Sequence, residues 1–582
     1  MKVKFAIILH FHQPIGNFDH VIESVCNKCY FPFLNLAKNY PEIKMNLHFS
    51  GCLLEWFEQK RPDIIDIIKQ MVQSKQIELI SGAMYEPILI SIPDYDAKEQ
   101  IKRLNNYIKK KFFYEAKGAW IAERVWEPSL ASVLYDSNIK YSILDDTHFL
   151  YAGLKKEQTY AYYITEDVGK TIAIFPSDKE LRYSIPYQHS DHIINYFKSV
   201  SANIQNPLFI YADDGEKFGE WPGTYKWVFE DNWLKNFFEK IKQNISWIKT
   251  VKLSEYLEEN SSNGNIYFPT SSYEEMLQWA LPVESQENME MVLQDIKYMG
   301  KEDWYKTFIR GGFWRNFLTK YSEANNMNKK MLYISKNFKN LNIKSNKILE
   351  KIRTYILKAQ CNCVYWHGVF GGLYLFHLRK AVYYNLIKAS VLMDEIIFNK
   401  QSFIKYDVLD IDADTLEEVI LENKHLLLYV DPKEGGVLKE ISSKTICHNF
   451  VNTLTRRKEA YHSKILDKIK NKQFVENTDN GVRTIHDNIQ VIDSNISDKF
   501  YYDKYERYSA IDHIINKDVS IDMFYKCEYN ELFENMNKGY NFAITKKNDK
   551  VILRMEKDER IYNSDINIIK EISLEKEKIF RI

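Results

Sequence analysis

Cysteine is scarce in this chain, which has only seven, an odd number, among 582 residues. So few thiols cannot form the disulfide framework that stabilises small secreted proteins, and we expect them to be reduced. Cys26 and Cys29 form a C-x-x-C pair, but neither a second pair nor a histidine at zinc-ligand spacing accompanies it. We therefore interpret these two cysteines as ordinary helix residues.

An excess of charge of either sign is also missing, since 79 Lys and Arg residues balance 79 Asp and Glu residues. This balance indicates neither nucleic acid nor an anionic membrane surface as a partner. No apolar run approaches the ~18 residues that span a bilayer. The run from Phe5 to Leu9 is short and lacks a following cleavage site, so it predicts a buried strand. We expect a cytoplasmic protein and leave a homodimer open as its assembly.

A regular alternation of short apolar segments and amphipathic segments fills the first 250 residues. The amphipathic segments 62–76 and 97–112 have apolar residues three and four positions apart, which is typical of helices. Repeated strand–helix units predict a parallel sheet, and about seven of them predict an incomplete TIM-like barrel of the (β/α)7 type. The expected strands are 4–9, 45–49, 77–80, 118–122, 141–144, 171–175 and 208–211.

The length predicts two or three domains, because a single hydrophobic core stops growing well below this size. We expect the α/β barrel in residues 1–285 and a helical segment in residues 286–400. Residues 401–582 have strand patterns with turns at Asp431-Pro432 and Gly435-Gly436, which predict a β-sandwich. Within this domain, residues 455–500 are charged and weakly periodic, and we expect a long loop or a poorly ordered insertion there.

Polar residues occur at or just after the ends of the expected barrel strands. The carboxyl ends of barrel strands form the rim on which active sites are built, because the loops converge there over a rigid base. Loop capping explains any one of these residues, but it does not explain the whole set. The set is His10, His12, His48, Glu78, Glu123, Asp145, Asp146, Asp178, Asp213 and Asp214.

Two acidic segments of this set are candidates for a catalytic pair. Glu123 follows the fourth expected strand and Asp214 the seventh, so the two face each other across a barrel mouth. Two carboxylates across a cleft are what glycoside cleavage needs, and nearby Trp and Tyr side chains suit the stacking of sugar rings. Asp213 and Asp214 diverge if the strand pleat persists, and the spacing does not say which points inward. The alternative is a solvated acidic loop.

His10 and His12 support a different hypothesis. Two histidines separated by one residue on a strand point the same way, which suits a metal pair in barrels of the deacetylase kind. A metal-dependent deacetylase or hydrolase is therefore a rival interpretation.

Several segments in order over about 370 residues resemble glycoside hydrolase family 57, specifically its 4-α-glucanotransferase and α-amylase branch. A weaker similarity, "GGVLKEISSK" and "LTRRKEAYH", extends into the C-terminal region. The matching segments are "HFHQPIGNF" (10–18), "QIEL" (76–79), "WIAERVWEP" (120–128), "DDGEKFGEWPGTY" (213–225), "SYEEMLQWALP" (272–282) and "YWHGVFGGLYL" (365–375).

The resemblance implies a retaining mechanism, with Glu123 as the nucleophile and Asp214 as the general acid/base. It implies an α-glucan or maltooligosaccharide substrate and requires neither a cofactor nor a metal, so the histidines become hydroxyl-binding groups. It also implies that the helical segment 286–400 completes the active site. The residues expected to line the sugar subsites are His10, His12, Glu78, Trp120, Glu216, Trp221 and Trp366.

The chain departs from the family pattern at Cys363, where the family usually has Asp, and at Lys75, where it usually has Gly. The C-terminal domain also looks short for this branch. We expect a 4-α-glucanotransferase that transfers glucan segments between maltooligosaccharides. The alternatives are hydrolysis of the same substrates, as in an α-amylase, and a catalytically impaired glucan-binding protein in which Cys363 has removed a charged hydrogen-bond acceptor.

Overall fold

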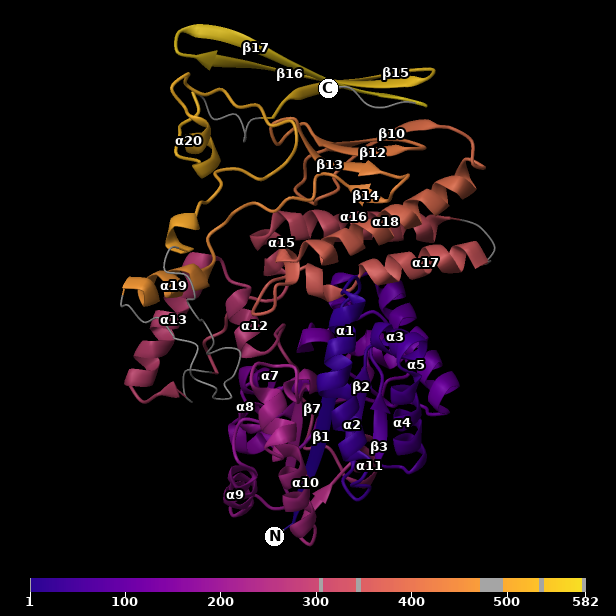
Figure 1. The fold of residues 1–582 in the computed structure, drawn as a ribbon, viewed down its shortest axis with the longest axis vertical. Coiled ribbons are helices and arrows are strands. Elements are labelled where there is room, and N and C mark those ends of the chain that lie inside the picture. The colour runs from indigo at the N-terminus through magenta and orange to yellow at the C-terminus, as the bar shows by residue number, and fades with distance from the viewer. Residues whose placement is uncertain (1, 303–306, 342–346, 471–495, 533–538, 578–582) are drawn as a thin grey trace. The chain divides into compact units, whose positions relative to one another are not determined.

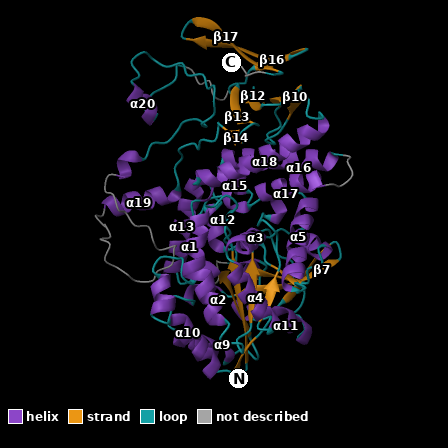
Figure 2. Ribbon diagram, turned by 45° about the vertical axis from the view of Figure 1, so that its right-hand side comes forward, coloured by secondary structure: helices purple, strands orange, loops and turns teal. Residues whose placement is uncertain are grey.

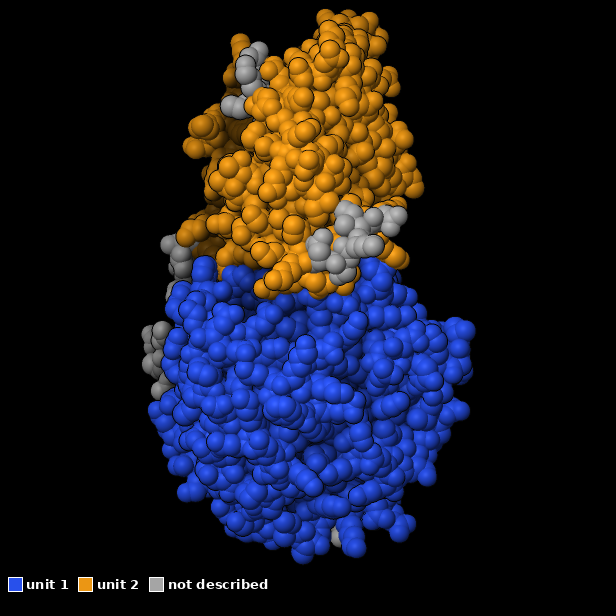
Figure 3. Space-filling view, turned by 90° about the vertical axis from the view of Figure 1, so that its right-hand side faces the viewer, with its two compact units in different colours: residues 1–320, 368–370, 472–492 blue, residues 321–367, 371–471, 493–582 orange. Residues whose placement is uncertain are grey.

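The computed structural model describes residues 2–302, 307–341, 347–470, 496–532 and 539–577. The chain forms two compact units, which Figure 3 colours blue and orange. Unit 1 contains the described residues up to Lys320 and the short segment Gly368–Phe370. Unit 2 contains the other described residues from Tyr321 onward.

Within the described part of unit 1, seven parallel strands form a barrel. Four of them make one sheet in the order β3-β2-β1-β8, and three make another in the order β4-β5-β7. Ser81, which follows β3, pairs with Ala119 of β4, and the Asp178 N–H after β7 donates to Ile210 O of β8 at 2.8 Å. The sheets therefore join at both edges. The strands are β1 (Val3–Phe11), β2 (Met45–Phe49), β3 (Ile77–Ile80), β4 (Gly118–Ala119), β5 (Tyr141–Asp145), β7 (Lys170–Ser177) and β8 (Leu208–Asp214).

The predicted (β/α)7 barrel is confirmed, and each of its strands overlaps an expected one. The expected strand 118–122 is too long, because only Gly118 and Ala119 pair with β5 before the chain turns at Glu123. Two short strands accompany the barrel: β6 (Tyr163–Asp167) is antiparallel to β7, and β9 (Ile248–Thr250) is parallel to the start of β1.

Helices surround these strands. Figure 1 shows α3, α4 and α5 on one side of the barrel strands and α7, α8 and α9 on the other. Helix α4 illustrates the reason, since its isoleucines and Met71 are buried along one face and Pro62 occupies its first turn. The helices of unit 1 include α1 (Asp19–Val25), α2 (Phe31–Ala37), α3 (Gly51–Lys60), α4 (Pro62–Gln73), α5 (Asp94–Phe112), α6 (Leu130–Asp136), α7 (Asp146–Tyr151), α8 (Lys179–Ser184), α9 (Ser190–Ser201), α10 (Trp233–Gln243), α11 (Leu253–Glu259), α12 (Glu274–Trp279), α13 (Val283–Tyr298) and α15 (Asn316–Lys320).

Unit 2 combines helices with two antiparallel sheets, drawn purple and orange in Figure 2. Side chains of both sheets share one buried cluster, as in a β-sandwich. The first sheet contains β10 (Ile404–Leu409), β11 (Glu418–Asn423), β12 (Leu426–Asp431), β13 (Val437–Ser443) and β14 (His448–Asn449), and the second contains β15 (Asn541–Lys547), β16 (Lys550–Ile561) and β17 (Ser564–Glu575). The helices include α16 (Ser322–Asn340), α17 (Lys347–Ala359), α18 (Phe376–Ile397), α19 (Ala460–Lys470) and α20 (Ile521–Lys526).

The loop expected over residues 455–500 is partly wrong, because α19 occupies Ala460–Lys470. Tyr461, Ile465 and Ile469 recur every four residues there, which favours a helix. Residues 471–495 lie outside the described residues. Among the helices that are described, none is long and apolar enough to cross a membrane.

Helix α4 is followed, two residues after its end, by a lysine in a backbone conformation that favours glycine. Lys75 has φ 58°, its N–H donates to Val72 O at 3.0 Å, and the Gln76 N–H donates to Met71 O at 3.0 Å. These two bonds form a Schellman motif, whose left-handed position is usually glycine because a Cβ is strained there. The geometry explains why a glycine suits the position that Lys75 fills.

Replacing Lys75 by glycine should therefore stabilise the protein by about 1 kcal/mol, because it removes the strain of a left-handed non-glycine residue. The free energy of unfolding in urea measures this effect. Gln70→Gly is the matched control, because Gln70 is an exposed residue inside α4. It should destabilise the protein by about 1 kcal/mol. A loss of stability in Lys75→Gly would contradict the prediction.

Candidate active site

Glu123 lies in a tight turn just beyond β4. Its φ is 54° and that of Arg124 is 49°, so two consecutive non-glycine residues adopt the left-handed conformation. The Ser272 hydroxyl donates to the Glu123 carbonyl at 2.5 Å, and the Tyr273 hydroxyl donates to Glu123 Oε2 at 2.8 Å. Left-handed residues of this kind persist where surrounding structure holds them, and they cluster at functional sites. The turn fixes the direction of the Glu123 carboxylate.

The two neighbouring acids at the end of β8 have different surroundings. Asp213 is buried and forms ion pairs with Lys217, through the Nζ–Oδ2 contact, and with Arg182, whose Nε lies 3.6 Å from Oδ2. Asp214 is half-buried, and its N–H donates to Asp213 Oδ1 at 3.0 Å. Asp213 therefore faces buried cations, whereas the charge of Asp214 acts on Glu123.

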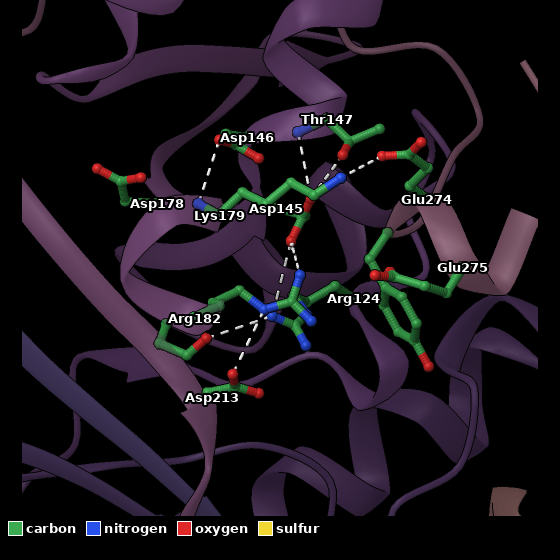
Figure 4. A network of polar contacts seen from close by, with 12 residues as sticks. Arg124, Asp145, Asp146, Thr147, Asp178, Lys179, Arg182, Asp213, Glu274 and Glu275 are labelled. Carbon is green, nitrogen blue, oxygen red and sulfur yellow. Dashed lines mark hydrogen bonds and ion pairs between the residues drawn. The ribbon is translucent and has the colours of Figure 1, made fainter. Parts of the chain in front are cut away.

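Asp213 belongs to a buried charge network (Figure 4). Asp145, the last residue of β5, accepts from Arg182 Nη1 at 2.6 Å and lies 3.8 Å from Arg124 Nη1. The Thr147 hydroxyl donates to Asp145 Oδ1 at 2.6 Å. Both guanidinium groups also lie over the Tyr273 ring, at 5.1 Å for Arg124 and 5.6 Å for Arg182. The network links the turn that carries Glu123 to the strand end that carries Asp214.

These surroundings separate the pKa values of the acids. Burial would raise the pKa of Asp213, but Lys217 and Arg182 hold it below the ordinary value. Burial and the neighbouring Asp213 charge raise the pKa of Asp214. Burial and the Asp214 charge raise the pKa of Glu123 to about 7, although the Tyr273 hydrogen bond opposes this shift. Two neighbouring carboxyl groups with raised pKa values suit acid/base chemistry.

The histidines of β1 and β2 line the same region. Strand pairing sets His10 between His48 and Asp214 in register. Nδ1 of His10 and Nδ1 of His48 lie 2.7 Å apart, and the His10 ring stacks on Trp120 at 4.8 Å. Burial and the neighbouring His48 lower the pKa of His10 well below its usual value, so both rings are neutral hydrogen-bonding groups. His10 and His12 face the same way, with ring centroids 5.9 Å apart.

Glu216 lies in the turn after β8 and is held by two donors. The Tyr30 hydroxyl donates to Glu216 Oε1 at 2.6 Å, and the His12 N–H donates to the same oxygen at 3.1 Å. Burial and the Asp214 charge raise the pKa of Glu216 to about 7. Trp221 lies nearby, with the Lys217 ammonium 5.0 Å from its ring centre. The two residues join His10, His12 and Trp120 beside the Asp214 turn.

The structure places two further expected site residues as follows. Glu78 does not sit at a strand end as expected, because it is the second residue of β3 and is fully buried. Its carboxylate accepts from the Tyr141 hydroxyl at 2.6 Å and from the Ser254 N–H at 3.0 Å, on β5 and α11. Trp366 belongs to unit 2, where its indole N–H donates to Asn362 Oδ1 at 2.9 Å. Contact of these two residues with a sugar stays a prediction.

The group of possible metal ligands that contains His10 is not the His10–His12 pair expected from the sequence. Among the described residues, His10 groups with His48 and Glu86 rather than with His12, with ligand atoms within 4.8 Å of one another. His48 Nε2 lies 3.4 Å from Glu86 Oε1. His10 Nδ1 already contacts His48 Nδ1, so the set is a histidine pair backed by a carboxylate.

Sequence reasoning missed the cations that control the acids. Arg182 comes from α8 and Lys217 from the turn after β8, and both are buried. Lys217 lies inside the segment "DDGEKFGEW", four residues after Asp213, and this spacing could have indicated an ion pair between them. Tyr273 lies inside the segment "SYEEM", but it is 150 residues from Glu123 in the sequence, so no local pattern predicts their contact. Arg182 had no signal in the sequence.

Three family models match the chain. "Glycosyl hydrolase family 57" covers residues 6–269, and the middle and C-terminal domains of "Alpha-amylase/4-alpha-glucanotransferase" cover residues 312–393 and 410–582. The chain is 39% identical to the 4-alpha-glucanotransferase of Thermococcus litoralis over 93% of its own length and 79% of that protein. It belongs to glycosyl hydrolase family 57.

This family 57 chain is also 38% identical to alpha-amylase 1 of Dictyoglomus thermophilum, over 94% of its own length and 78% of that protein. The crystal structure of the Thermococcus litoralis 4-alpha-glucanotransferase matches its fold with a TM-score of 0.86 and 36% identity, covering 100% of this chain and 84% of that one. A family 57 branching enzyme from Pyrococcus horikoshii, with a TM-score of 0.51 and 13% identity, covers 69% of this chain and 92% of that one and shares the fold alone.

Replacing Asp145 by asparagine should destabilise the protein by about 3–5 kcal/mol, because two buried guanidinium groups lose their shared counter-charge. The Arg182 and Arg124 charges hold the pKa of Asp145 below its usual value against the effect of burial. Its stabilising effect is therefore complete above the unfolded pKa of about 4 and is lost as the pH falls through the lower folded value.

Urea unfolding at pH 7 and at decreasing pH measures this difference. Asp191→Asn is the control, since Asp191 is exposed and pairs with Lys240 at the surface. The control should change stability by less than about 0.5 kcal/mol. An Asp145→Asn protein as stable as the control at pH 7 would show that the network is dispensable.

Proposed function

We propose that this family 57 protein is a retaining α-1,4-glucan enzyme, a 4-α-glucanotransferase that transfers glucan segments between maltooligosaccharides. One observation carries the proposal: Glu123 lies just beyond β4 and Asp214 ends β8, and burial together with the Asp214 charge raises the pKa of Glu123 to about 7. Relatives at 37–39% identity named 4-alpha-glucanotransferase or alpha-amylase support the substrate class.

In the proposed mechanism, Glu123 attacks the anomeric carbon while Asp214 donates its proton to the departing glycosidic oxygen. The bond to the leaving sugar breaks as the Glu123 ester forms. Asp214, now ionised, then removes a proton from the 4-hydroxyl of an acceptor glucan, whose oxygen displaces Glu123 and regenerates an α-linkage. When water replaces the acceptor, the same step is hydrolysis. No cofactor or metal takes part in either step.

The fixed charge of Asp213 explains how the pair divides its roles. Asp213 stays ionised between Lys217 and Arg182, so its negative charge favours the protonated form of Asp214. Arg124 and the Tyr273 hydroxyl favour the ionised form of Glu123. The first step needs one proton on Asp214 and an ionised Glu123. The Asp213 charge, Arg124 and the Tyr273 hydroxyl favour this arrangement, whereas the burial of Glu123 opposes it.

The surrounding aromatic and polar groups suit α-glucan binding. We propose that Trp120 and Trp221 pack against sugar rings, and that His10, His12 and Glu216 hydrogen-bond sugar hydroxyls. Glu78 and Trp366 stay in this set on the family likeness. The division of the chain into residues 1–285, 286–400 and 401–582, a cytoplasmic location and a homodimeric assembly also remain proposals.

Purified protein incubated with maltotetraose should produce both longer and shorter chains, and chromatography by length resolves them. Asp214→Ala should lower this activity by about 10²–10⁴-fold, because a proton donor is lost. Glu123→Ala should lower it by more than about 10⁴-fold, because the covalent route is lost. Both substitutions truncate a side chain without removing an ion pair, and circular dichroism checks that each variant is folded.

An α-maltosyl fluoride substrate separates the two roles. Fluoride leaves without a proton, so Asp214→Ala should form the glycosyl-enzyme from this substrate and Glu123→Ala should not. Mass spectrometry of the intact protein detects the adduct. An adduct on Glu123→Ala would contradict the assigned nucleophile.

The product pattern decides between the candidate functions. Shorter chains alone would mean α-amylase-type hydrolysis. Unchanged maltotetraose, together with measurable binding, would favour the impaired glucan-binding protein. Cys363→Asp in the same assay then tests whether the missing acid at that position explains the lack of activity.

Replacing Asp213 by asparagine should move the alkaline limb of the kcat/KM profile to lower pH by about one unit, because two effects act in the same direction. The negative charge that raises the pKa of Asp214 disappears, and Lys217 and Arg182 gain influence on Asp214. Asp214 therefore loses its catalytic proton at a lower pH.

The measurement is kcat/KM for maltooligosaccharide turnover across pH 5–9, with Asp191→Asn as the surface control. Asparagine keeps an oxygen for the Asp214 N–H, so the backbone contact survives. An alkaline limb that stays in place or moves to higher pH would refute the role given to Asp213.

A further inference from the structure

A group of four carboxylates lies in unit 2, in the connection between β10 and β11. Asp410, Asp412 and Asp414 alternate along the loop, and Glu418 begins β11. One oxygen of each residue lies within 4.8 Å of those of the other three. Like charges this close repel one another unless a cation lies among them.

The loop backbone is arranged around Asp410. Its Oδ1 accepts from the N–H groups of Ala413 at 2.8 Å and Asp414 at 3.2 Å, and its Oδ2 accepts from the Thr415 N–H at 3.1 Å. Asp414 Oδ1 accepts from the Leu416 N–H at 2.7 Å. These bonds wind the loop so that its alternate side chains converge.

Two buried oxygens in this group point to a ligand. Glu418 is fully buried, and Asp412 is 8% exposed. Glu418 Oε1 and Asp412 Oδ1 accept no hydrogen bond from the described residues. The other oxygen of each is engaged, with Glu418 Oε2 accepting from the Ile411 N–H at 2.7 Å and Asp412 Oδ2 contacting Lys439 Nζ at 2.7 Å. A buried carboxylate oxygen without a partner is costly, and a cation would satisfy both.

The positive charge near the loop is too small to balance it. Lys439 pairs with Asp412, and its Nζ also lies 2.7 Å from Asp431 and 2.8 Å from Glu434. No lysine or arginine in the described ranges pairs with Asp410, Asp414 or Glu418. One ammonium thus serves three carboxylates, and three others have none.

We propose that the loop 410–418 binds one calcium ion through the carboxylates of Asp410, Asp412, Asp414 and Glu418. An all-oxygen set of acids is the donor type that Ca²⁺ takes, and Ca²⁺ tolerates varied ligand geometry, whereas Mg²⁺ demands a near-ideal octahedron. The bound ion has a structural role in the β-sandwich, because its ligands come from the β10–β11 connection and the first residue of β11.

The sequence spacing agrees with this assignment in part. Asp410, Asp412 and Asp414 occupy the first, third and fifth positions of a calcium-binding loop, and Thr415, with φ 78°, occupies the sixth, where glycine is usual. The twelfth position, which usually carries a bidentate glutamate, is Leu421. With one bidentate ligand missing, we expect a dissociation constant on the order of 10⁻⁵–10⁻³ M.

Calcium binding by the full-length protein tests the proposal. Protein stripped with chelator should take up one Ca²⁺ per chain in isothermal titration calorimetry. Calcium at about 100 times its dissociation constant should raise the unfolding temperature of unit 2 by roughly 5 °C, and Mg²⁺ at the same concentration should raise it less. No uptake of Ca²⁺ up to about 10 mM, well above the weakest sites of this kind, would overturn the proposal.

Substitutions of the proposed ligands test whether the calcium ion binds at this loop. Asp410→Asn and Glu418→Gln keep the size and hydrogen-bonding oxygen of each side chain but remove a charge, so each should weaken Ca²⁺ binding at least tenfold. The control is Asp565→Asn, an 89% exposed acid on the β16–β17 hairpin, and it should bind Ca²⁺ as the wild type does. Equal affinity in Asp410→Asn, Glu418→Gln and the control would overturn the assignment.

A luminescence measurement decides the case if those variants do not fold. Tb³⁺ replaces Ca²⁺ in carboxylate sites and emits when a nearby tyrosine is excited. The Tyr429 hydroxyl lies 3.4 Å from Glu418 Oε2, so the wild type should sensitise Tb³⁺ and Tyr429→Phe should lose most of that emission. Excess Ca²⁺ should quench the signal. Emission that is unchanged in Tyr429→Phe would place the ion elsewhere and refute the site.

Discussion

The buried ion pair between Asp213 and its two cations is the interaction on which the rest of the site depends. Lys217 and Arg182 keep Asp213 charged in a place where burial alone would protonate it. Asp214 follows Asp213 directly, so a negative charge lies one residue from Asp214 and raises its pKa. The Asp145 carboxylate in turn positions Arg182 and Arg124. A chain of alternating charges therefore connects three strand ends of the barrel and ends beside Asp214.

The barrel and the acid pair could be predicted from the sequence because both depend on local patterns. Apolar segments at regular intervals marked the seven strands, and acids at the strand ends marked the rim. The spacing alone could not choose between Asp213 and Asp214, and only the family resemblance favoured Asp214, because their surroundings depend on the direction of Lys217 and Arg182 in three dimensions. Glu78 was misplaced for a similar reason. Its strand is only four residues long, and Glu78 lies two positions before the strand ends at Ile80, so its side chain is buried away from the rim.

The position of Glu123 also comes from tertiary contacts rather than from local preference. The residues around it pattern as a strand, yet pairing with β5 ends at Ala119 and the backbone turns left-handed at Glu123 and Arg124. Ser272 and Tyr273, which lie about 150 residues later, hold that turn. The unfavourable backbone energy is thus compensated by contacts that a local window of sequence does not contain. This explains why the fourth strand was predicted too long while its catalytic candidate was found.

The pairing of β1 has a consequence for how the chain folds as it is synthesised. This first strand lies between β2, β8 and β9, and the last of these ends at Thr250. β1 therefore leaves the ribosome long before two of its three partners exist. Until about 250 residues have been made, one edge of an apolar strand stays open to solvent and to other chains. Closure of the barrel is a late, non-local event, and the active site forms at the same moment, because His10 and Asp214 meet only when β1 pairs with β8.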